Sequence, residues 1–467
     1  MSDQPAVSVP VEEGVLAKTF HEVTQPFVDL IHASRALWGV NLSYLLEGLT
    51  YFGVVGLLAI YFNDYIGLDD INAGEMVGFQ TAGITLAMLF LGATVDMFGA
   101  RKSLLISLTV MLVGRVLLAV GPSLTGTHGL WSSAHLVAMG GIIGIVIGYG
   151  IYMPACYAAV KYFTTEKTAA MGYAMLYALM NLGGFLPGLI SPPLRRAFGI
   201  TGVFWVYAAI TVLGIIAVAI ILTKKAMNDA MQNSGWSKTV NKDAPGEKKT
   251  VKEQMVYYVK NFPIRDYRFI FFIFILIPVQ TLFAHNWLTL PQYFSRAFTG
   301  VVQNNFEFFV NFNPILIFIL TPMVAALTTK SDTYKMMIIG TFVMASPTFI
   351  LALGPTIYTA FAYLIIMTIG EAMWQPRFLQ WVAEIAPREM TGIYMGLGQF
   401  PWFLTKVITS LYSGWFLMHY CPQGVPPEQM NTETMWLIYG FIAIISPIGL
   451  WLAWGWMKKG FKVKNAE

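Results

Sequence analysis

The chain has 467 residues, of which 56% are hydrophobic and only 12% are charged. Soluble proteins average about 25% charged residues, so this composition excludes an ordinary soluble protein and indicates a polytopic membrane protein. The net charge of +4 is modest, and the basic residues lie between apolar segments, so we expect no nucleic-acid partner.

The chain opens with a polar segment. Residues 1–34 contain acidic side chains and lack the basic start and short apolar core of a secretory signal, so we expect an uncleaved cytoplasmic segment. Apolar windows of about 20 residues, long enough to cross a bilayer, follow. In the first half they lie near residues 35–62, 72–97, 103–121, 134–163, 169–193 and 201–223.

A charged segment then divides the chain. Residues 224–266 are rich in Lys, Asn and Gly and are predicted to form a cytoplasmic linker. The pattern predicts an all-α integral membrane protein of twelve transmembrane helices in two six-helix bundles, residues 35–223 and 267–457, with a cytoplasmic tail at 458–467. The second-half windows lie near residues 267–294, 304–328, 335–354, 356–385, 392–418 and 434–457.

Basic residues in the loops predict the orientation of the chain. Most of them fall on one side, which we expect to be cytoplasmic together with both termini, in the plasma (inner) membrane and surrounded by lipid. Arg195, Arg196 and Arg296 fall on the other side and contradict the rule. The supporting residues include Arg101, Lys102, Lys161, Lys167, Lys330, Lys335 and Arg388.

One carboxylate, Glu47, lies inside the first apolar window. An ionised side chain at such a position costs at least about 2.5 to 3.5 kcal/mol, so we expect Glu47 to face a polar interior and to be functional. Tyr44 and Tyr51 share its face of the helix and are candidate substrate ligands. The alternative is a neutral Glu that bonds a neighbouring helix for packing alone.

The loop between the second and third windows reads GATVDMFGARK, residues 92–102. Its spacing, G-x-x-x-D-x-x-G-x-R-K, resembles the loop signature of the major facilitator superfamily. We expect Asp96 to meet a helix N-terminus across the interface between the halves, near Gly392, while Arg101 supplies ion pairing. The candidate residues for conformational gating are Gly92, Asp96, Gly99, Arg101 and Lys102.

Further motifs resemble those of the proton-coupled oligopeptide transporters, a branch of that superfamily. EGLTYFG at 47–53 resembles E-R-F-x-Y-Y-G, and YALMNLGGF at 177–185 resembles F/Y-x-x-x-N-x-G-S/G. NPILIFILTP at 313–322 matches N-P-x-x-I-x-x-x-x-P, and GEAMWQP at 370–376 resembles G-E-x-x-x-x-P. The resemblance implies secondary active transport by alternating access, with a small-molecule site between the halves.

Four positions depart from the pattern of that family. Where the family has Glu, Arg, Arg and Lys, this chain has Tyr44, Gly48, Val55 and Met153. A buried substrate carboxylate without a cationic partner costs several kcal/mol, which argues against ordinary di- and tripeptides. A peptide-like solute that is neutral or bears an amine fits better.

The tenth window carries a second candidate carboxylate, Glu371. The resemblance assigns it to the amino end of the substrate, so that with Glu47 each half would give the cavity one carboxylate. Trp374 and Gln375 follow at i+3 and i+4 and are candidate ligands on the same face. The alternatives are a structural hydrogen bond of Glu371 near Pro376 and a packing role for Trp374.

Three amides complete the candidate substrate ligands: Asn181, Gln280 and Asn313. Gln280 stands in the middle of the seventh window, whereas Asn181 and Asn313 can alternatively join helices. His285 lies near the end of the same window and is weighed as a gate or interface residue against a proton site.

Glu47, with Glu371, is the predicted proton-coupling site, because a desolvated carboxyl without a cation nearby should titrate close to physiological pH. Proton symport is the first expectation. Export of hydrophobic or cationic compounds by proton antiport, and a non-transporting receptor of the same fold, are the alternatives.

The sequence predicts neither an enzyme nor a metalloprotein. Cys156 and Cys421 have no further ligands nearby, and no nucleophile, base and orienting group come together as a catalytic site requires. We therefore expect no cofactor, protons as the coupling ion, and a monomer.

Overall fold

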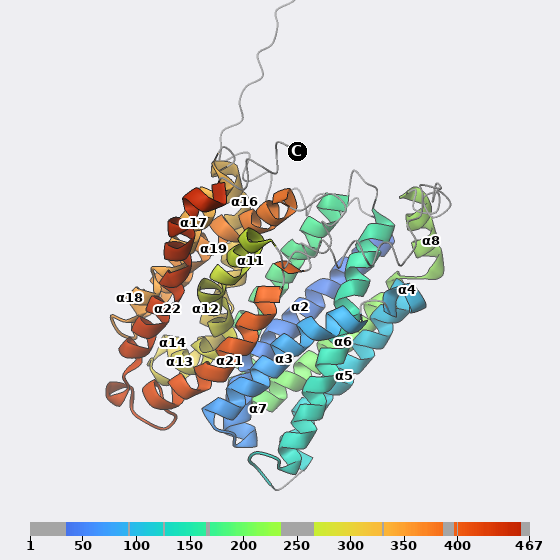
Figure 1. The fold of residues 1–467 in the computed structure, drawn as a ribbon. Helices are drawn as coiled ribbons and strands as arrows, with labels where there is room; N and C mark the ends of the chain where they lie inside the picture. The colour runs from blue at the N-terminus through green and yellow to red at the C-terminus, as the bar shows by residue number, and fades with distance from the viewer. Residues whose placement is uncertain are drawn as a thin grey trace, which may run out of the picture.

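Helices that run side by side make up almost all of the computed structural model (Figure 1). It describes residues 34–91, 94–124, 127–164, 169–234, 266–328, 331–385, 397–398 and 400–458. The first half contains α2 (Arg35–Tyr61), the π-helix η1 (Phe62–Ile66), α3 (Asp70–Leu91), α4 (Thr94–Phe98), α5 (Ala100–Leu124), α6 (Ser133–Phe163), α7 (Ala169–Ile221) and α8 (Lys224–Asn233).

In the second half, several crossings are built from consecutive shorter helices. These helices lie together on the other side of the molecule, yellow to red in Figure 1. They are α11 (Tyr267–Ile275), α12 (Ile277–Leu288), α13 (Leu290–Arg296), α14 (Val301–Asn304), α15 (Phe306–Val310), α16 (Phe312–Leu327), α17 (Thr333–Ala345), α18 (Thr348–Leu351), α19 (Ile357–Ile385), α21 (Phe400–Tyr420), the 3-10 helix η3 (Pro427–Gln429) and α22 (Thr432–Leu452).

The number of crossings agrees with the sequence prediction. In the described part of the chain, nine helical stretches are long and apolar enough to cross a membrane. One of them, Met175–Ile221, has 47 residues, far more than the roughly 20 that one crossing needs, and it breaks at Gly199 into two. With α3 and α21 the total is twelve, and the predicted fold class is confirmed.

The break within α7 requires glycine. Gly199 has φ +68°, a left-handed conformation that side chains with a Cβ rarely adopt. A Cβ there would lie 2.5 Å from the hydroxyl oxygen of Tyr65. That hydroxyl accepts a hydrogen bond from the backbone N–H of Ile200 at 3.1 Å, so it also satisfies a donor that the break leaves free.

Glycines set the closest approaches between helices of the first half. A Cβ added to Gly183 of α7 would lie 2.6 Å from the carbonyl oxygen of Leu45 on α2. A Cβ on Gly48 of α2 would lie 3.1 Å from the carbonyl oxygen of Met180. Gly48 therefore lies where α2 and α7 pack closely, and even a Cβ would make tight contacts there.

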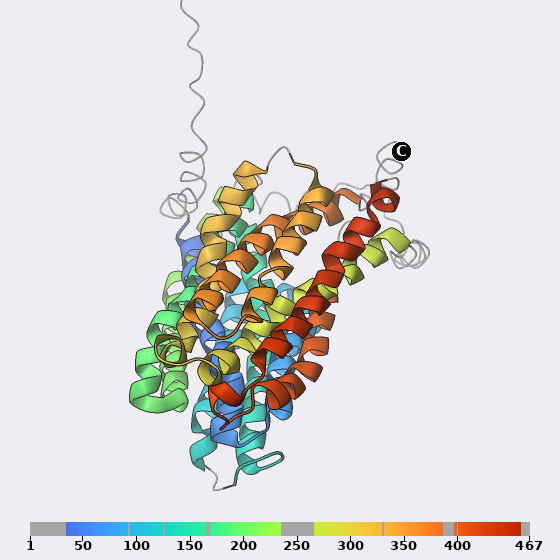
Figure 2. The same ribbon diagram turned by 90° about the vertical axis from the view of Figure 1, so that its left-hand side faces the viewer.

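The predicted linker begins as a helix. Thr223 caps the N-terminus of α8, and the hydroxyl of Ser234 donates to the carbonyl oxygen of Tyr162 at 2.8 Å, so α8 packs against the first half. The rest of the linker lies outside the described residues. We call the end of the molecule that carries α8 and the last turn of α22 the linker end (Figures 1 and 2). The opposite end, with residues 62–70, 195–200, 290–307 and 421–423, is the distal end.

Candidate functional site

A cavity of about 380 Å³ lies between the two halves. The first half lines it from α2, α6 and α7, and the second half from α12, α15, α16 and α19. Among the described residues that line it, Glu371 is the only Asp, Glu, Lys, Arg or His. The predicted ligands found in the wall are Tyr44, Asn181, Asn313, Glu371 and Gln375.

The carboxyl of Glu371 is positioned by the second half alone. Glu371 is 4% exposed and lies near the centre of α19. The amide nitrogen of Asn313, on α16, donates to Oε2 of Glu371 at 2.8 Å and lies 3.0 Å from the hydroxyl of Thr368. The hydrogen bond expected for Glu371 is therefore present, but it joins α16 to α19 at the cavity wall rather than at the kink.

Aromatic rings form another part of the wall. Phe283 and Trp287 of α12 meet edge to face with ring centroids 5.0 Å apart, and Phe52 of α2 lies 6.4 Å from Trp287. Tyr157 and Tyr177 also line the cavity. Such a wall suits an apolar or aromatic group of a solute and, through the ring faces, a cation.

Two positions that would be charged in the oligopeptide transporters are neutral here. The hydroxyl of Tyr44 donates to the thioether sulfur of Met153 at 3.3 Å, and both residues line the cavity. The described wall therefore contains no lysine, arginine or histidine. A solute carboxylate buried in this cavity would meet no cation from that wall.

Three predicted ligands do not line the cavity. Trp374 is fully buried and its indole N–H donates to the sulfur of Met344 at 3.1 Å, which supports the packing alternative. Gln280 accepts a hydrogen bond from Thr405 at 3.1 Å, and Tyr51 packs against Tyr149 with centroids 4.9 Å apart. In this structure each of the three side chains faces a neighbouring helix of its own half instead of the described cavity wall.

The expectation that Glu47 has no cation nearby was also wrong. Nη1 of Arg115 on α5 lies 3.0 Å from Oε2 of Glu47, and Nη2 hydrogen-bonds with Oε1. Arg115 also donates to the hydroxyl of Thr211 on α7, and Glu47 and Arg115 are 2% and 0% exposed. Glu47 thus lies in an ion pair inside the first half and does not line the cavity.

The sequence contained a signal for this pair. Arg115 is the one cation within the apolar window 103–121, and a charged side chain at such a position is expected to have a partner inside the bundle. The positions on the first and fourth crossings that are cationic in the family pattern are neutral in this chain: Gly48, Val55 and Met153. The compensating cation comes from the third.

The loop motif is only partly described. Gly99 has φ +76°, as the tight turn requires, and Lys102 is exposed. Arg101 donates to the carbonyl oxygen of Ala219 at 3.3 Å, near the C-terminus of α7, so its observed partner is a helix end of its own half. Gly92, the side chain of Asp96 and the region of Gly392 lie outside what the structure describes.

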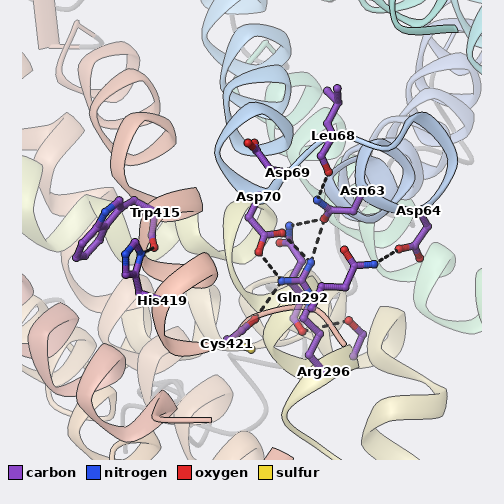
Figure 3. A network of polar contacts seen from close by, with 12 residues as sticks. Asn63, Asp64, Leu68, Asp69, Asp70, Gln292, Arg296, Trp415, His419 and Cys421 are labelled. Carbon is purple, nitrogen blue, oxygen red and sulfur yellow. Dashed lines mark hydrogen bonds and ion pairs between the residues drawn. The ribbon is translucent and has the colours of Figure 1, made fainter. Parts of the chain in front are cut away.

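A polar network joins the halves at the distal end (Figure 3). Arg296 of α13 binds both carboxylate oxygens of Asp70 at 2.7 Å and also donates to Asn63 at 3.1 Å and to the carbonyl oxygen of Cys421 at 3.1 Å. Gln292 donates to Asn63 at 3.2 Å. These bonds connect η1 and α3 with the second half.

Two further arginines reinforce the distal closure. Arg195 of α7 pairs with the buried carboxylate of Glu307 on α15, and Arg196 donates to the side-chain oxygen of Asn305 at 3.0 Å. Arg195, Arg196 and Arg296 are the residues that contradict the charge rule for loops. Each of them has a partner in the opposite half, which explains why these cations lie on that side.

His285 is buried away from the cavity wall. Its ring nitrogens lie 2.7 Å from the hydroxyl of Thr289 and 3.1 Å from that of Tyr412, and the ring stacks on Tyr439 with centroids 4.0 Å apart. These partners belong to the second half. The ring therefore connects helices within the second half and does not reach the described cavity wall.

Comparison with known proteins places these features in a family. The sequence profile described as Major Facilitator Superfamily matches residues 40–302. Over 464 residues the chain is 22% identical to dipeptide and tripeptide permease A of Escherichia coli (strain K12). This alignment covers 86% of this chain and 88% of the permease. Over 227 residues it is 28% identical to the putative metabolite transport protein YdjK of the same organism. This alignment covers 45% of this chain and 47% of that protein.

Solved structures show the same fold. The crystal structure of peptide transporter POT in complex with sulfate has a TM-score of 0.68 at 18% identity and covers 91% of this chain and 96% of that one. The structure of a POT family transporter in complex with 5-aminolevulinic acid has a TM-score of 0.67 at 15% identity. The match covers 91% of this chain and 97% of that one. The predicted superfamily and the resemblance to oligopeptide transporters are confirmed.

Proposed function

The chain belongs to the Major Facilitator Superfamily and is a secondary active transporter rather than an enzyme. We propose that its solute is small, peptide-like and amine-bearing, and that this solute binds in the cavity between the halves. Protons drive its movement by alternating access, and Glu371 is the group that binds them.

One observation carries this proposal: Glu371 is the only charged side chain in the described wall of the cavity. A single anion with no cation beside it attracts an ammonium group and repels a carboxylate. The amides of Asn181 and Gln375 and the aromatic rings of Phe283 and Trp287 can contact a peptide group and an apolar side chain.

The position of Glu371 supports its role as the proton site. It lines the cavity, and its hydrogen bond from Asn313 is a neutral one. Glu47, in contrast, pairs with Arg115 inside the first half and does not line the cavity. Of these two carboxyls, Glu371 is therefore the one that a solute in the cavity can reach.

The distal network supports alternating access. Arg296, Arg195 and Arg196 join the halves at that end, so the structure has its distal side closed. Opening this side requires the pairs with Asp70 and Glu307 to separate. In the closed arrangement both pairs are largely shielded from water: Glu307 is 2% exposed and Asp70 is 6% exposed.

The proposal includes a location. The chain lies in the plasma (inner) membrane with both termini in the cytoplasm, and one copy contains the whole cavity, so a monomer is sufficient. Cysteines introduced at the exposed positions Gln303 and Lys335 would test the orientation. In intact cells, a reagent that does not cross membranes should label Gln303→Cys at the distal end and should label Lys335→Cys only after permeabilisation.

Counterflow in proteoliposomes tests the transport proposal. Vesicles preloaded with unlabelled alanyl-phenylalanine amide should transiently accumulate the labelled amide from outside. Free alanyl-phenylalanine, which carries a carboxylate, should accumulate much less. Glu371→Gln should abolish accumulation, whereas the matched control Trp374→Phe, in the same helix but outside the cavity, should retain it.

The possible outcomes separate the candidate functions. Equal counterflow of the amide and the free dipeptide would contradict the amine-bearing class. Stoichiometric binding of the amide without counterflow would identify a receptor of transporter fold instead.

A further inference from the structure

We propose that a second cavity, at the distal end, binds a small zwitterion and that its occupation holds the distal side closed. The ligand carries a free carboxylate and a free ammonium group on one molecule, as an amino acid or a short peptide does. The site is separate from the cavity around Glu371, called the central cavity below. Its role is regulation rather than transport.

The distal cavity lies between the two halves. It has a volume of about 400 Å³ and shares no lining residue with the central cavity. The first half lines it from the end of α2, from η1 and from the break in α7. The second half lines it from α13, α14, α15 and Gln423. A ligand that fills this cavity therefore contacts both halves at once.

Irregular backbone builds the wall that the first half provides. The π-helical turn η1 supplies Asn63, Asp64 and Tyr65, and the break in α7 supplies Gly199 and Ile200. The hydroxyl of Tyr65 accepts the hydrogen bond from the N–H of Ile200, so the two irregular segments are joined. Because π-helical turns are rare and occur frequently at functional sites, this wall is a candidate ligand site.

Asp64 is the acceptor for the ammonium group. Its side chain is exposed, and Gln423 donates to its Oδ1 at 2.7 Å. In the part of the chain that the structure describes, Oδ2 of Asp64 has no partner and the carboxylate forms no ion pair. Asp64 lies beside Asn63 in the distal network (Figure 3). A carboxylate in this situation attracts an ammonium group.

Two arginines in the wall provide donors for the carboxylate of the ligand. Arg195 uses Nε and Nη2 for Glu307 and also donates from Nη2 to the carbonyl oxygen of Asn304 at 3.1 Å. Arg296 uses both of its Nη atoms for Asp70. Among the described residues, Nη1 of Arg195 and Nε of Arg296 have no partner. These N–H groups can donate to a carboxylate.

The balance of charge favours a zwitterion over a single ion. Within the described residues, the charged groups that line the distal cavity or bond to its wall are three cations and three anions: Arg195, Arg196, Arg296, Asp64, Asp70 and Glu307. A zwitterion adds no net charge to this set. An anion or a cation alone would add one charge without a counter-charge to a partly buried space, which is costly.

The two cavities therefore select different solutes. The described wall of the central cavity has no arginine or lysine, whereas the distal wall has Arg195 and Arg296. Free alanyl-phenylalanine, which the central cavity disfavours, has both charges that the distal cavity can bind. Its amide lacks the carboxylate and should be the poorer distal ligand.

A ligand in the distal cavity stabilises the closed distal side. Asp64 belongs to the first half and Arg296 to the second, so separation of the halves at this end takes apart the two charged parts of the site. A ligand that binds only the closed arrangement lowers the open fraction by a factor of one plus the ratio of its concentration to Kd. At ten times Kd this factor is about ten.

Binding is measured with labelled free alanyl-phenylalanine on full-length Glu371→Gln protein in nanodiscs of phosphatidylglycerol, a lipid whose headgroup carries no ammonium group. Glu371→Gln removes the carboxylate proposed to bind the transported solute, so the binding that remains reports the distal cavity. We expect one bound dipeptide per chain. Alanyl-phenylalanine amide, which lacks the carboxylate, and N-acetyl-alanyl-phenylalanine, which lacks the ammonium group, should each bind at least about tenfold more weakly.

Two matched variants locate the site. Asp64→Asn, added to Glu371→Gln, should weaken binding of the dipeptide by about tenfold or more, and its amide oxygen can still accept the hydrogen bond from Gln423. Asp69→Asn is the control. Asp69 is also an exposed acid at the distal end, but it bonds to Asn72 at 2.8 Å and does not line the distal cavity. Asp69→Asn should leave binding unchanged.

The thiol of Cys421, which is buried at the distal end, reports closure. In the chain with Glu371 and Asp64 intact, free alanyl-phenylalanine at ten times Kd should slow maleimide labelling of Cys421 by about tenfold. At the same concentration, Asp64→Asn should show slowing of no more than about twofold, because Kd is about tenfold higher.

Each outcome has a defined meaning. Absence of dipeptide binding, equal binding of all three ligands, or equal effects of Asp64→Asn and Asp69→Asn would overturn the site. Binding that leaves the labelling of Cys421 unchanged or makes it faster would overturn the closure. Absence of counterflow of the amide would contradict the proposed function alone, because no residue of the distal cavity lines the central one.

Discussion

At the scale of single residues, Glu47 and Glu371 are two buried carboxylates with different chemistry. Glu47 has a guanidinium partner in its own half, and Glu371 has a neutral amide and faces the cavity. Ordinary sequence reasoning treats both as desolvated acids. The difference between them is decided by Arg115, which lies 68 residues from Glu47 in the chain.

Removing one member of the buried pair should be costly. Arg115→Met leaves the carboxylate of Glu47 buried without a partner, and we expect a loss of about 3 to 5 kcal/mol in stability. Adding Glu47→Leu should recover most of this loss, because the double variant has no unpaired charge. Apparent melting temperatures of the purified variants measure both effects, and a double variant no more stable than Arg115→Met would contradict a structural role of the pair.

A cation in the cavity should reverse the preference for carboxylate-free solutes. Met153→Lys places an ammonium group in the wall, where a charge-assisted hydrogen bond to a solute carboxylate contributes about 1.5 to 3 kcal/mol. The affinity ratio of free alanyl-phenylalanine to its amide should rise by about tenfold or more. Met153→Leu, which keeps the wall apolar, is the matched control. An unchanged ratio in Met153→Lys would mean that the solute does not contact this wall.

Three of the predicted ligands lie in the cavity wall at motif positions that resemble those of the oligopeptide transporters or depart from them: Tyr44, Asn313 and Glu371. An uninterrupted helix alone was not sufficient, because Tyr51 shares α2 with Tyr44, and Trp374 shares α19 with Glu371, yet neither lines the cavity. Gln280 was assigned to the cavity on its position alone, but its crossing breaks at Leu276, between α11 and α12, and the residues that reach the cavity come later. Sequence periodicity cannot show which neighbouring helix each face of a broken helix contacts.

At the scale of elements, α3 and α21 form a close interface between the halves. Their backbones meet near the distal end, where a Cβ on Gly414 would lie 2.3 Å from the carbonyl oxygen of Asp70. About two turns further along α3, Gly78 faces Ser410, and about two turns beyond that Lys406 reaches Thr85. The small residues allow the two helices to stay together from the distal end towards the cavity.

A methyl group in this interface should favour opening of the distal side. In Gly78→Ala the new Cβ would lie 2.2 Å from Cβ of Ser410, so the closed interface cannot form without displacement. Cys421 is a native reporter: it is buried at this end, and burial raises the pKa of its thiol to about 12. Its thiol is therefore inert at neutral pH while the distal side is closed.

We expect the labelling rate of Cys421 by a maleimide to rise about tenfold in Gly78→Ala, equivalent to roughly 1.4 kcal/mol. Ser410→Gly added to Gly78→Ala should restore the slow rate because it removes the clash. Cys156, buried within the first half, reports any general unfolding. Labelling of Cys156 in parallel with Cys421 would show that the substitution unfolds the protein rather than opening one side.

The elements themselves were largely predictable, because a run of about 20 apolar residues has few alternatives to a transmembrane helix. The break at Gly199 separates the fifth and sixth crossings close to their predicted boundary. Less could be said about the start of the linker. Residues 224–233 form a helix that packs on the first half, and a polar composition alone does not show that contact.

At the scale of the whole molecule, charge decides where the halves separate. The distal closure depends on Arg296 and its two contacts with Asp70. Asp70→Asn weakens these contacts, and we expect faster labelling of Cys421 and no change at Cys156. An unchanged rate at Cys421 would mean that the remaining bonds, such as that from Arg195 to Glu307, are sufficient to close this end.

The most direct test of the account concerns which carboxylate couples protons to transport. Proteoliposomes that contain the parent, Glu371→Gln or Glu47→Leu/Arg115→Met are placed in an imposed pH gradient, and movement of labelled alanyl-phenylalanine amide is followed. The parent and the double variant should move the amide against its concentration gradient only while the pH gradient is present, and Glu371→Gln should not. Gradient-driven movement that survives in Glu371→Gln, or that is lost in a folded double variant, would contradict the account.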